Sequence, residues 1–208
     1  TVGIVDRPAM IGPARVQDGD VLIGLASSGL HSNGYSLARK VCTEGKTLYE
    51  LTIARDELEG DSVLDALLEP TRIYVKSIRS VLLQCPGAIH SLAHITGGGI
   101  TENLNRALPS TLDAEIQVGS WNMVPILPWV CRAAHLNETE ALKTFNMGLG
   151  MILAVAPQKA EEVAQLLADA GEEVYIVGQV VPGVGKVVYL DEEELFAAYS
   201  EDEEAEED

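Results

Sequence analysis

The sequence has few aromatic residues, few cysteines and few basic residues, and it has no long apolar run. Aromatic residues make up 5% of the 208 residues, and cysteines stand only at positions 42, 85 and 131. No stretch approaches the ~20 apolar residues of a membrane-spanning helix, and the first residues do not resemble a secretory signal. The cysteines are odd in number and widely spaced, which is not typical of zinc sites or disulfides. We therefore expect reduced thiols in a cytoplasmic protein without a membrane partner.

Basic residues are outnumbered, since 14 Lys and Arg stand against 32 Asp and Glu, for a formal charge of −18. Eleven of the acidic residues lie in 191–208, which leaves a charge of −7 on residues 1–190. No basic face is evident, so nucleic-acid binding is not expected. The segment EDEEAEED repels itself and is typical of a solvated tail without fixed structure.

The ends of the chain suggest three parts. Thr1-Val2-Gly3-Ile4-Val5 lacks an initiating methionine and resembles a strand, and turn residues follow it up to Asp20. We expect residues 1–20 to be the remnant of a preceding domain and a linker. Residues 21–190 are expected to form one domain, and residues 191–208 a disordered acidic tail.

Apolar periodicity predicts alternating strands and helices. The expected strands are Val21 to Ala26, Ile89 to Ile95, Ala114 to Val118, Gly150 to Ala156, Val174 to Val181 and Lys186 to Leu190. The expected helices are Tyr35 to Cys42, Val63 to Leu68, Thr71 to Gln84, Ile100 to Ala107, Pro125 to Ala134, Glu138 to Thr144 and Gln158 to Ala170. Asn137 with Glu140 reads as a helix capping box. The pattern predicts a layered α/β or α+β sandwich, and we expect the α+β class, with helices that flank a mixed sheet.

The stretch SSGLHSNGYS, residues 27–36, lies between an expected buried strand and an expected helix. A glycine-rich turn of this kind directs backbone N–H groups toward the helix N-terminus, where an anion such as phosphate is favoured. Hydroxyl and amide side chains can add hydrogen bonds, and His31 can transfer a proton near neutral pH. The alternative is a helix entry rich in capping residues, with His31 a polar loop residue that makes few core contacts.

A second stretch, HITGGGITEN from His94 to Asn103, repeats the order of strand, histidine, glycines and helix. Three consecutive glycines cost conformational entropy and therefore need a reason. Close approach of a ligand to the backbone is one reason, and a tight turn with positive φ is the other. Two such loops in one domain favour the ligand.

Standard motifs do not fit. Gly183-Val184-Gly185-Lys186 lacks the Gly and the Ser or Thr that a phosphate-binding P-loop requires at positions 180 and 187. We interpret it as a hairpin turn. No metal-binding spacing of His, Cys, Asp or Glu occurs, so no metal ligand is assigned.

Four blocks resemble a known family. GDVLIGLASSGLHSNGYSLARKV, LLEPTRIYVKSI, HITGGGITENLNRALP and FNMGLGMILAV occur in the order found in the C-terminal half of aminoimidazole ribonucleotide (AIR) synthetases, the phosphoribosylformylglycinamidine cyclo-ligases. The resemblance spans roughly Gly3 to Leu190. It implies ATP-dependent ring closure of formylglycinamidine ribonucleotide in purine biosynthesis, through phosphorylation of the formyl oxygen.

The resemblance also implies a site and partners. Proton transfer would fall to His31 and His94, and phosphate or substrate contacts to Ser28, Ser32, Asn33, Thr96, Gly97, Gly98, Gly99 and Asn146. Capping or turn roles stay open for these polar residues. The Mg²⁺ ligands and the ATP site are expected in an N-terminal domain that this chain lacks, as is most of a homodimer interface. We therefore expect the chain alone to be inactive.

Two alternatives remain at this point. The chain could be a non-catalytic α/β interaction module that kept the domain shape, or it could belong to a related ATP-dependent enzyme. The intact glycine-rich loops favour the cyclo-ligase. The sequence does not indicate which loop receives ATP and which receives the ribose phosphate.

Overall fold

A computed structural model describes residues 2–192 and 195–196. Its single sheet contains β1 (Val21–Ala26), β2 (Ile89–His94), β3 (Leu112–Gln117), β4 (Leu149–Val155), β5 (Val174–Pro182) and β6 (Val187–Leu190). The helices are α1 (Tyr35–Thr43), α2 (Leu48–Leu51), α3 (Val63–Leu68), α4 (Val75–Gln84), α5 (Gly99–Arg106), α6 (Ile126–Ala133), α7 (Glu138–Thr144) and α8 (Ala160–Asp169). Short 3-10 turns lie at Arg7–Ala9, Pro13–Arg15, Asp56–Leu58 and Pro157–Lys159.

The sheet is mixed, with strand order β2-β4-β1-β5-β3-β6. All neighbouring pairs are antiparallel except β3 and β6, which are parallel. The predicted α+β class with a mixed sheet is therefore confirmed.

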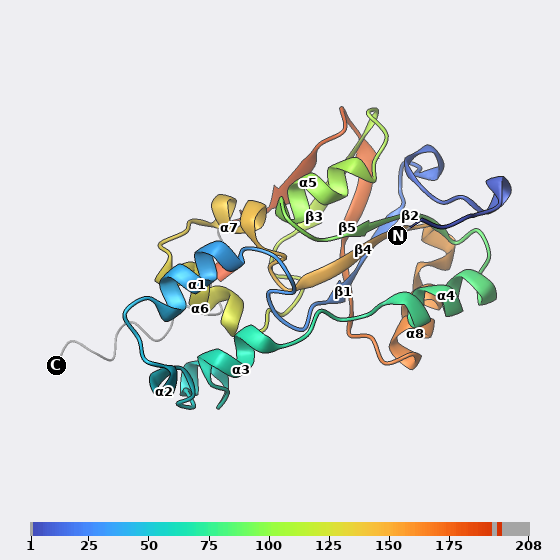
Figure 1. Cartoon of the computed structure of the whole chain (residues 1–208). Helices are drawn as coiled ribbons and strands as arrows, with labels where there is room; N and C mark the ends of the chain where they lie inside the picture. Colours follow the sequence, from blue (N-terminus) through green and yellow to red (C-terminus); the bar gives the residue numbers. More distant parts are fainter. Residues whose placement is uncertain (1, 193–194, 197–208) are drawn as a thin grey trace.

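Apolar side chains cover both faces of the sheet because successive strand residues point in opposite directions. In β1, Leu22 packs into one core and Ile23 into the other. Figure 1 shows α4 and α8 together on one side of the sheet, and α1, α6 and α7 grouped on the other. The central strands β1 and β4 are therefore buried on both faces, whereas β6 alternates half-buried and exposed residues.

Local signals placed several helix ends correctly. Asn137 caps α7 through the N–H of Glu140, and the Glu140 side chain accepts the Asn137 N–H in return. Ser62 caps α3 in the same manner through the N–H of Asp65. The predicted capping box is confirmed.

The helix expected from Thr71 begins only at Val75. Residues 71–74 are held by tertiary hydrogen bonds: the Arg72 N–H donates to the His31 ring, and the Tyr74 hydroxyl donates to the carbonyl of Ala26 at 2.7 Å. Contacts distant in sequence thus override the local helical pattern, and the predicted start was wrong.

The expected hairpin turn at 183–186 was also wrong. Strands β5 and β6 do not pair with each other, because β3 lies between them. The carboxylate of Asp113 at the start of β3 accepts the N–H groups of Val184 and Lys186, both at 2.7 Å. The turn therefore wraps around the end of β3.

The two ends of the chain differ from expectation. Residues 2–6 form no strand among the described residues, and Val2 and Ile4 are exposed. Residues 11–20 pack on the domain, since Val16 is buried and the Gly12 N–H donates to the carbonyl of His90. The expected remnant is thus partly packed on the domain.

At the other end, Leu195 is only 4% exposed and belongs to the larger core. The packed part of the chain therefore continues past residue 190. Most of the tail expected at 191–208, namely residues 193–194 and 197–208, lies outside the described residues. Within the part that is described, no helix combines the length and the apolar content of a membrane span.

Candidate functional site

The two glycine-rich loops meet at one edge of the sheet. Strands β1 and β2 are both antiparallel to their common neighbour β4, so they run parallel and end at the same edge. The loop after β1 leads into α1, and the loop after β2 leads into α5. A Cβ added at Gly97 would lie 3.8 Å from Asn33 Oδ1, which places the second loop against the first. The topology thus brings together residues that are 64 positions apart in sequence.

The side chain of Asn146 holds the backbone of the first glycine-rich loop, which follows β1, in place. Its side chain is fully buried; Oδ1 accepts from Ser27 Oγ and from the Gly148 N–H, and Nδ2 donates to the carbonyl of Gly29. An amide that is buried and bonded in this way does not face the cleft. The structure gives Asn146 a positioning role in place of the expected ligand contact.

His31 lies inside the loop that it was expected to expose. The residue is 3% exposed at φ 55°, and its Nε2 accepts the N–H groups of Ser28 at 3.1 Å and Arg72 at 3.4 Å. Its Nδ1 is buried and has no hydrogen-bond partner among the described residues. The expectation that a loop histidine makes few core contacts was therefore wrong, because this ring joins two segments of the chain.

The environment of His31 keeps its ring neutral. Burial, followed by the nearby positive groups of His94 and Arg72, lowers its pKa from 6.5 to about 4. A neutral ring that accepts at Nε2 carries its proton on Nδ1. His31 can therefore give up a proton only from the buried, unpaired Nδ1.

We expect the free energy of unfolding to rise between pH 4 and pH 6.5 because of His31. In this range the unfolded histidine binds a proton and the folded one, with a pKa of about 4, does not, so acid favours unfolding. Urea unfolding of the parent and of His31→Gln across this range measures the effect. Glutamine can accept the same N–H groups but does not titrate. If the free energy of unfolding depended on pH in the same way in both proteins, the lowered pKa of His31 would be contradicted.

Residues 70–72 form a third segment at this edge of the sheet, which was not predicted from the sequence. Ser28 Oγ donates to the carbonyl of Pro70 at 2.7 Å, and the Ser32 and Thr71 hydroxyls are 3.2 Å apart. Arg72 follows, with its guanidinium 3.6 Å from the carboxylate of Glu172. The available signal was the EPTR stretch, which lies in one of the four family blocks.

The three glycines of the second loop serve different purposes. Gly97 is exposed, has no positive φ and has room for a ligand near Asn33. Gly98 has φ 93°, and a Cβ there would meet the exposed carboxylate of Glu102. Gly99 has φ 62°, and its Cβ would lie 1.9 Å from the Leu142 carbonyl oxygen on α7. Gly99 is therefore required by helix packing, which explains this glycine without a ligand.

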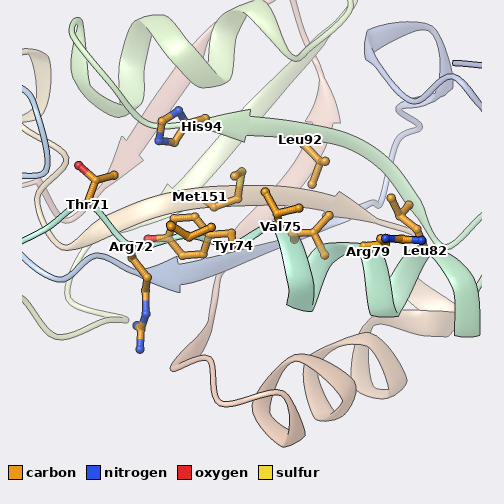
Figure 2. Close-up of a pocket in the computed structure, with 11 residues that line it drawn as sticks. Thr71, Arg72, Tyr74, Val75, Arg79, Leu82, Leu92, His94 and Met151 are labelled. Carbon is orange, nitrogen blue, oxygen red and sulfur yellow. The ribbon is translucent and has the colours of Figure 1, made fainter. Parts of the chain in front are cut away.

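His94 ends β2 beside a groove of about 530 Å³. Figure 2 shows Thr71 and Arg72 on the same side of this groove as His94, and mostly apolar side chains, with Arg79 among them, along the rest toward α4. His94 is exposed, in contrast to the buried His31. Of the two histidines, only His94 presents its ring to solvent at this edge.

Metal ligands were not expected in this chain. Over the described residues, no three His, Cys, Asp or Glu side chains come together as a possible metal site. The three cysteines are buried and unpaired, and burial raises the pKa of Cys131 to about 12. The polar groups that the structure places at this edge are backbone N–H groups, the hydroxyls of Ser28, Ser32 and Thr71, Arg72 and His94.

Comparison with curated proteins finds phosphoribosylformylglycinamidine cyclo-ligases among the relatives. The phosphoribosylformylglycinamidine cyclo-ligase of Brevibacillus brevis is 47% identical over 191 residues, which cover 91% of this chain and 54% of that protein. The cyclo-ligase of Lactobacillus delbrueckii subsp. bulgaricus is 46% identical over 180 residues, 86% of this chain and 51% of that protein. The chain spans about half the length of the curated relatives it matches.

Solved structures share the fold at low sequence identity. The thiamine-monophosphate kinase of Stenotrophomonas maltophilia has a TM-score of 0.58 at 16% identity, over 89% of this chain and 54% of that one. The hydrogenase maturation protein HypE of E. coli has a TM-score of 0.55 at 20% identity, over 86% and 49% of the two chains. These likenesses concern the fold alone.

A family model agrees with the relatives and with the fold. The model described as AIR synthase related protein, C-terminal domain, matches residues 17–191. The resemblance drawn from the four sequence blocks is thereby confirmed. The chain belongs to the family of AIR synthase related proteins, of which it carries the C-terminal domain.

Proposed function

We propose that this chain is the substrate-binding half of an ATP-dependent cyclo-ligase, which converts formylglycinamidine ribonucleotide to aminoimidazole ribonucleotide in the cytoplasm. The observation that carries the proposal is the meeting of two glycine-rich loops at one sheet edge, in a chain that is 47% identical to a cyclo-ligase. The reaction involves phosphate groups in both substrates. Backbone N–H groups at helix N-termini favour such anions.

The chain's own residues would bind and orient the anions. Gly97 lies close to Asn33 Oδ1, and the N–H groups of Gly97 and Gly98, the amide of Asn33 and the hydroxyl of Ser32 would contact the phosphate. His94 stands exposed beside this edge and is the candidate to donate or accept the proton of the ring closure. His31 holds the Ser28 and Arg72 backbone in place. Such phosphoryl-transfer chemistry depends more on positioning and charge than on a protein nucleophile.

ATP would supply the phosphoryl group that activates the formyl oxygen. The N–H groups of the second loop fit a phosphate, but the described residues contain no cluster of carboxylates that fits Mg²⁺. We propose that the metal ligands come from an upstream half, which would also form most of a homodimer interface. The partners of this chain are then a phosphorylated ribonucleotide and its own upstream half.

The chain alone is expected to show no ATP-dependent formation of aminoimidazole ribonucleotide. Activity should appear in a chimera in which this chain replaces the matching half of the Brevibacillus brevis relative. Product formation measured by chromatography decides the first point, and growth of a purine-requiring strain carrying the chimera decides the second. Robust turnover by the isolated chain would show that the ATP site lies within it.

Binding by the isolated chain gives a second measurement, which does not depend on how well the chimera assembles. We expect formylglycinamidine ribonucleotide or ATP to bind in calorimetry, and Gly97→Val to abolish that binding without a loss of melting temperature. Equal binding by the parent and Gly97→Val would contradict the position of the site.

A further inference from the structure

One buried side chain holds the carbonyl groups of the second loop. Asn103 lies one turn into α5 and is 9% exposed. Its Nδ2 donates to the carbonyl oxygens of Thr96 at 3.2 Å, Gly97 at 3.2 Å and Gly99 at 2.8 Å. Its Oδ1 accepts from Thr96 Oγ1 at 3.1 Å, which fixes the orientation of the amide. One side chain thus engages three peptide units of a four-residue loop.

The direction of these carbonyls sets the direction of the N–H groups. All described peptide bonds are trans, so each N–H points opposite to the carbonyl of the same peptide unit. The three carbonyls that face Asn103 share their peptide units with the N–H groups of Gly97, Gly98 and Ile100. Within the described residues, none of these N–H groups donates to a backbone acceptor. They therefore point away from Asn103, and at Gly97 the loop lies close to Asn33.

We propose that Asn103 is a positioning residue that turns the carbonyls of the second loop inward and thereby presents three N–H groups to the anionic oxygens of a phosphate. The inference rests on the proposed function, because that function supplies the anion. It also accounts for a polar residue in the buried face of α5, between Ile100 and Leu104 of the core. A buried amide that only filled space would cost free energy compared with leucine.

The test compares two substitutions that change the charge equally on the same helix. Asn103→Asp keeps the shape of the side chain but replaces the donating amide with a carboxylate, which repels the three carbonyls. Asn105→Asp makes the same change at an exposed position of α5 and is the matched control. Inorganic phosphate is titrated into each protein, and the amide resonances of Gly97, Gly98 and Ile100 are followed by NMR. Thermal melts verify that both variants fold.

We expect Asn103→Asp to shift these three amide resonances and to weaken phosphate binding by roughly tenfold or more relative to Asn105→Asp, which corresponds to the loss of one or more buried hydrogen bonds. If Asn103→Asp does not fold, Thr96→Val is the second variant, since it removes only the bond that orients the amide. It should shift the same resonances without adding a charge.

The outcomes for the two proposals are distinct. Unshifted loop resonances and equal phosphate affinity in Asn103→Asp and Asn105→Asp, or unshifted resonances in Thr96→Val, would overturn the role of Asn103. A parent chain whose loop amides do not respond to phosphate at any concentration would count against the anion site of the proposed function. In that case the loop resonances of the Asn103 variant still decide whether Asn103 sets the N–H direction.

Discussion

In the two-half chimera, His94→Ala is expected to lower turnover by ~10²-fold or more and to leave the melting temperature of the protein unchanged. The ring is exposed at the end of β2, so its removal opens no core cavity. Positioned acid–base groups typically contribute ~10² to 10⁴ to the rate. Steady-state kinetics beside thermal melts measure both quantities.

His31→Ala provides the contrast, because the same substitution should act mainly on stability. Removing the ring leaves the part-buried N–H groups of Ser28 and Arg72 without this acceptor, and the penalty of about 1–3 kcal/mol for a fully buried group is the upper limit for each. His31→Gln should recover most of the lost stability by accepting the same groups. If the His94→Ala variant turned over at the parent rate, His94 would have no role in proton transfer and would only be an exposed residue at the end of β2. If His31→Ala melted like the parent, the ring would not hold the loop.

Gly99→Ala is expected to destabilise the chain severely, by about 3 kcal/mol or more, because two penalties combine. The left-handed φ of 62° costs a residue with a Cβ about 1–2 kcal/mol, and the Cβ would overlap the Leu142 carbonyl oxygen at 1.9 Å. The obstacle is backbone of α7, which cannot move aside as a flexible side chain could. Urea unfolding measures the loss.

Gly97→Ala is the matched control two positions earlier. Gly97 has no positive φ, and its nearest neighbour would be Asn33 Oδ1 at 3.8 Å, so alanine should leave the free energy of unfolding within about 1 kcal/mol. The methyl group would instead stand in the space between the loops and weaken anion binding. Equal destabilisation by both substitutions would mean that the packing of α5 against α7 is not the reason for a glycine at position 99.

Much of the fold could be predicted because its signals are local. Strands such as β1 and β4 are short apolar runs bounded by turn residues, and the caps of α3 and α7 are side chains that bond N–H groups three residues away. The geometry of the first helical turn fixes the distance between a cap side chain and the N–H group three residues later. Periodicity and capping chemistry therefore suffice to place these elements.

The predictions of secondary structure were wrong where a group that is distant in sequence forms hydrogen bonds with the segment. The carboxylate of Asp113 accepts hydrogen bonds from the turn at 183–186, so this segment forms a loop around β3 and not the expected hairpin. The His31 ring and the Ala26 carbonyl keep residues 71–74 out of α4. The partners of these hydrogen bonds are far apart in sequence and meet only in the folded domain, so the pattern of a short segment cannot predict them.

The sequence by itself determined the family, the α+β class and the two glycine-rich loops as the place to look for an anion. Tertiary structure decided which residues of those loops are covered and which are exposed. It buries His31 and Asn146 as supports, leaves His94 exposed and assigns Gly99 to helix packing. The physical reason is that composition and spacing set which groups a loop contains, whereas burial and hydrogen-bond partners depend on neighbours from β4, α7 and residues 70–72. The same residue types are therefore either ligand contacts or supports, according to which of them the fold covers.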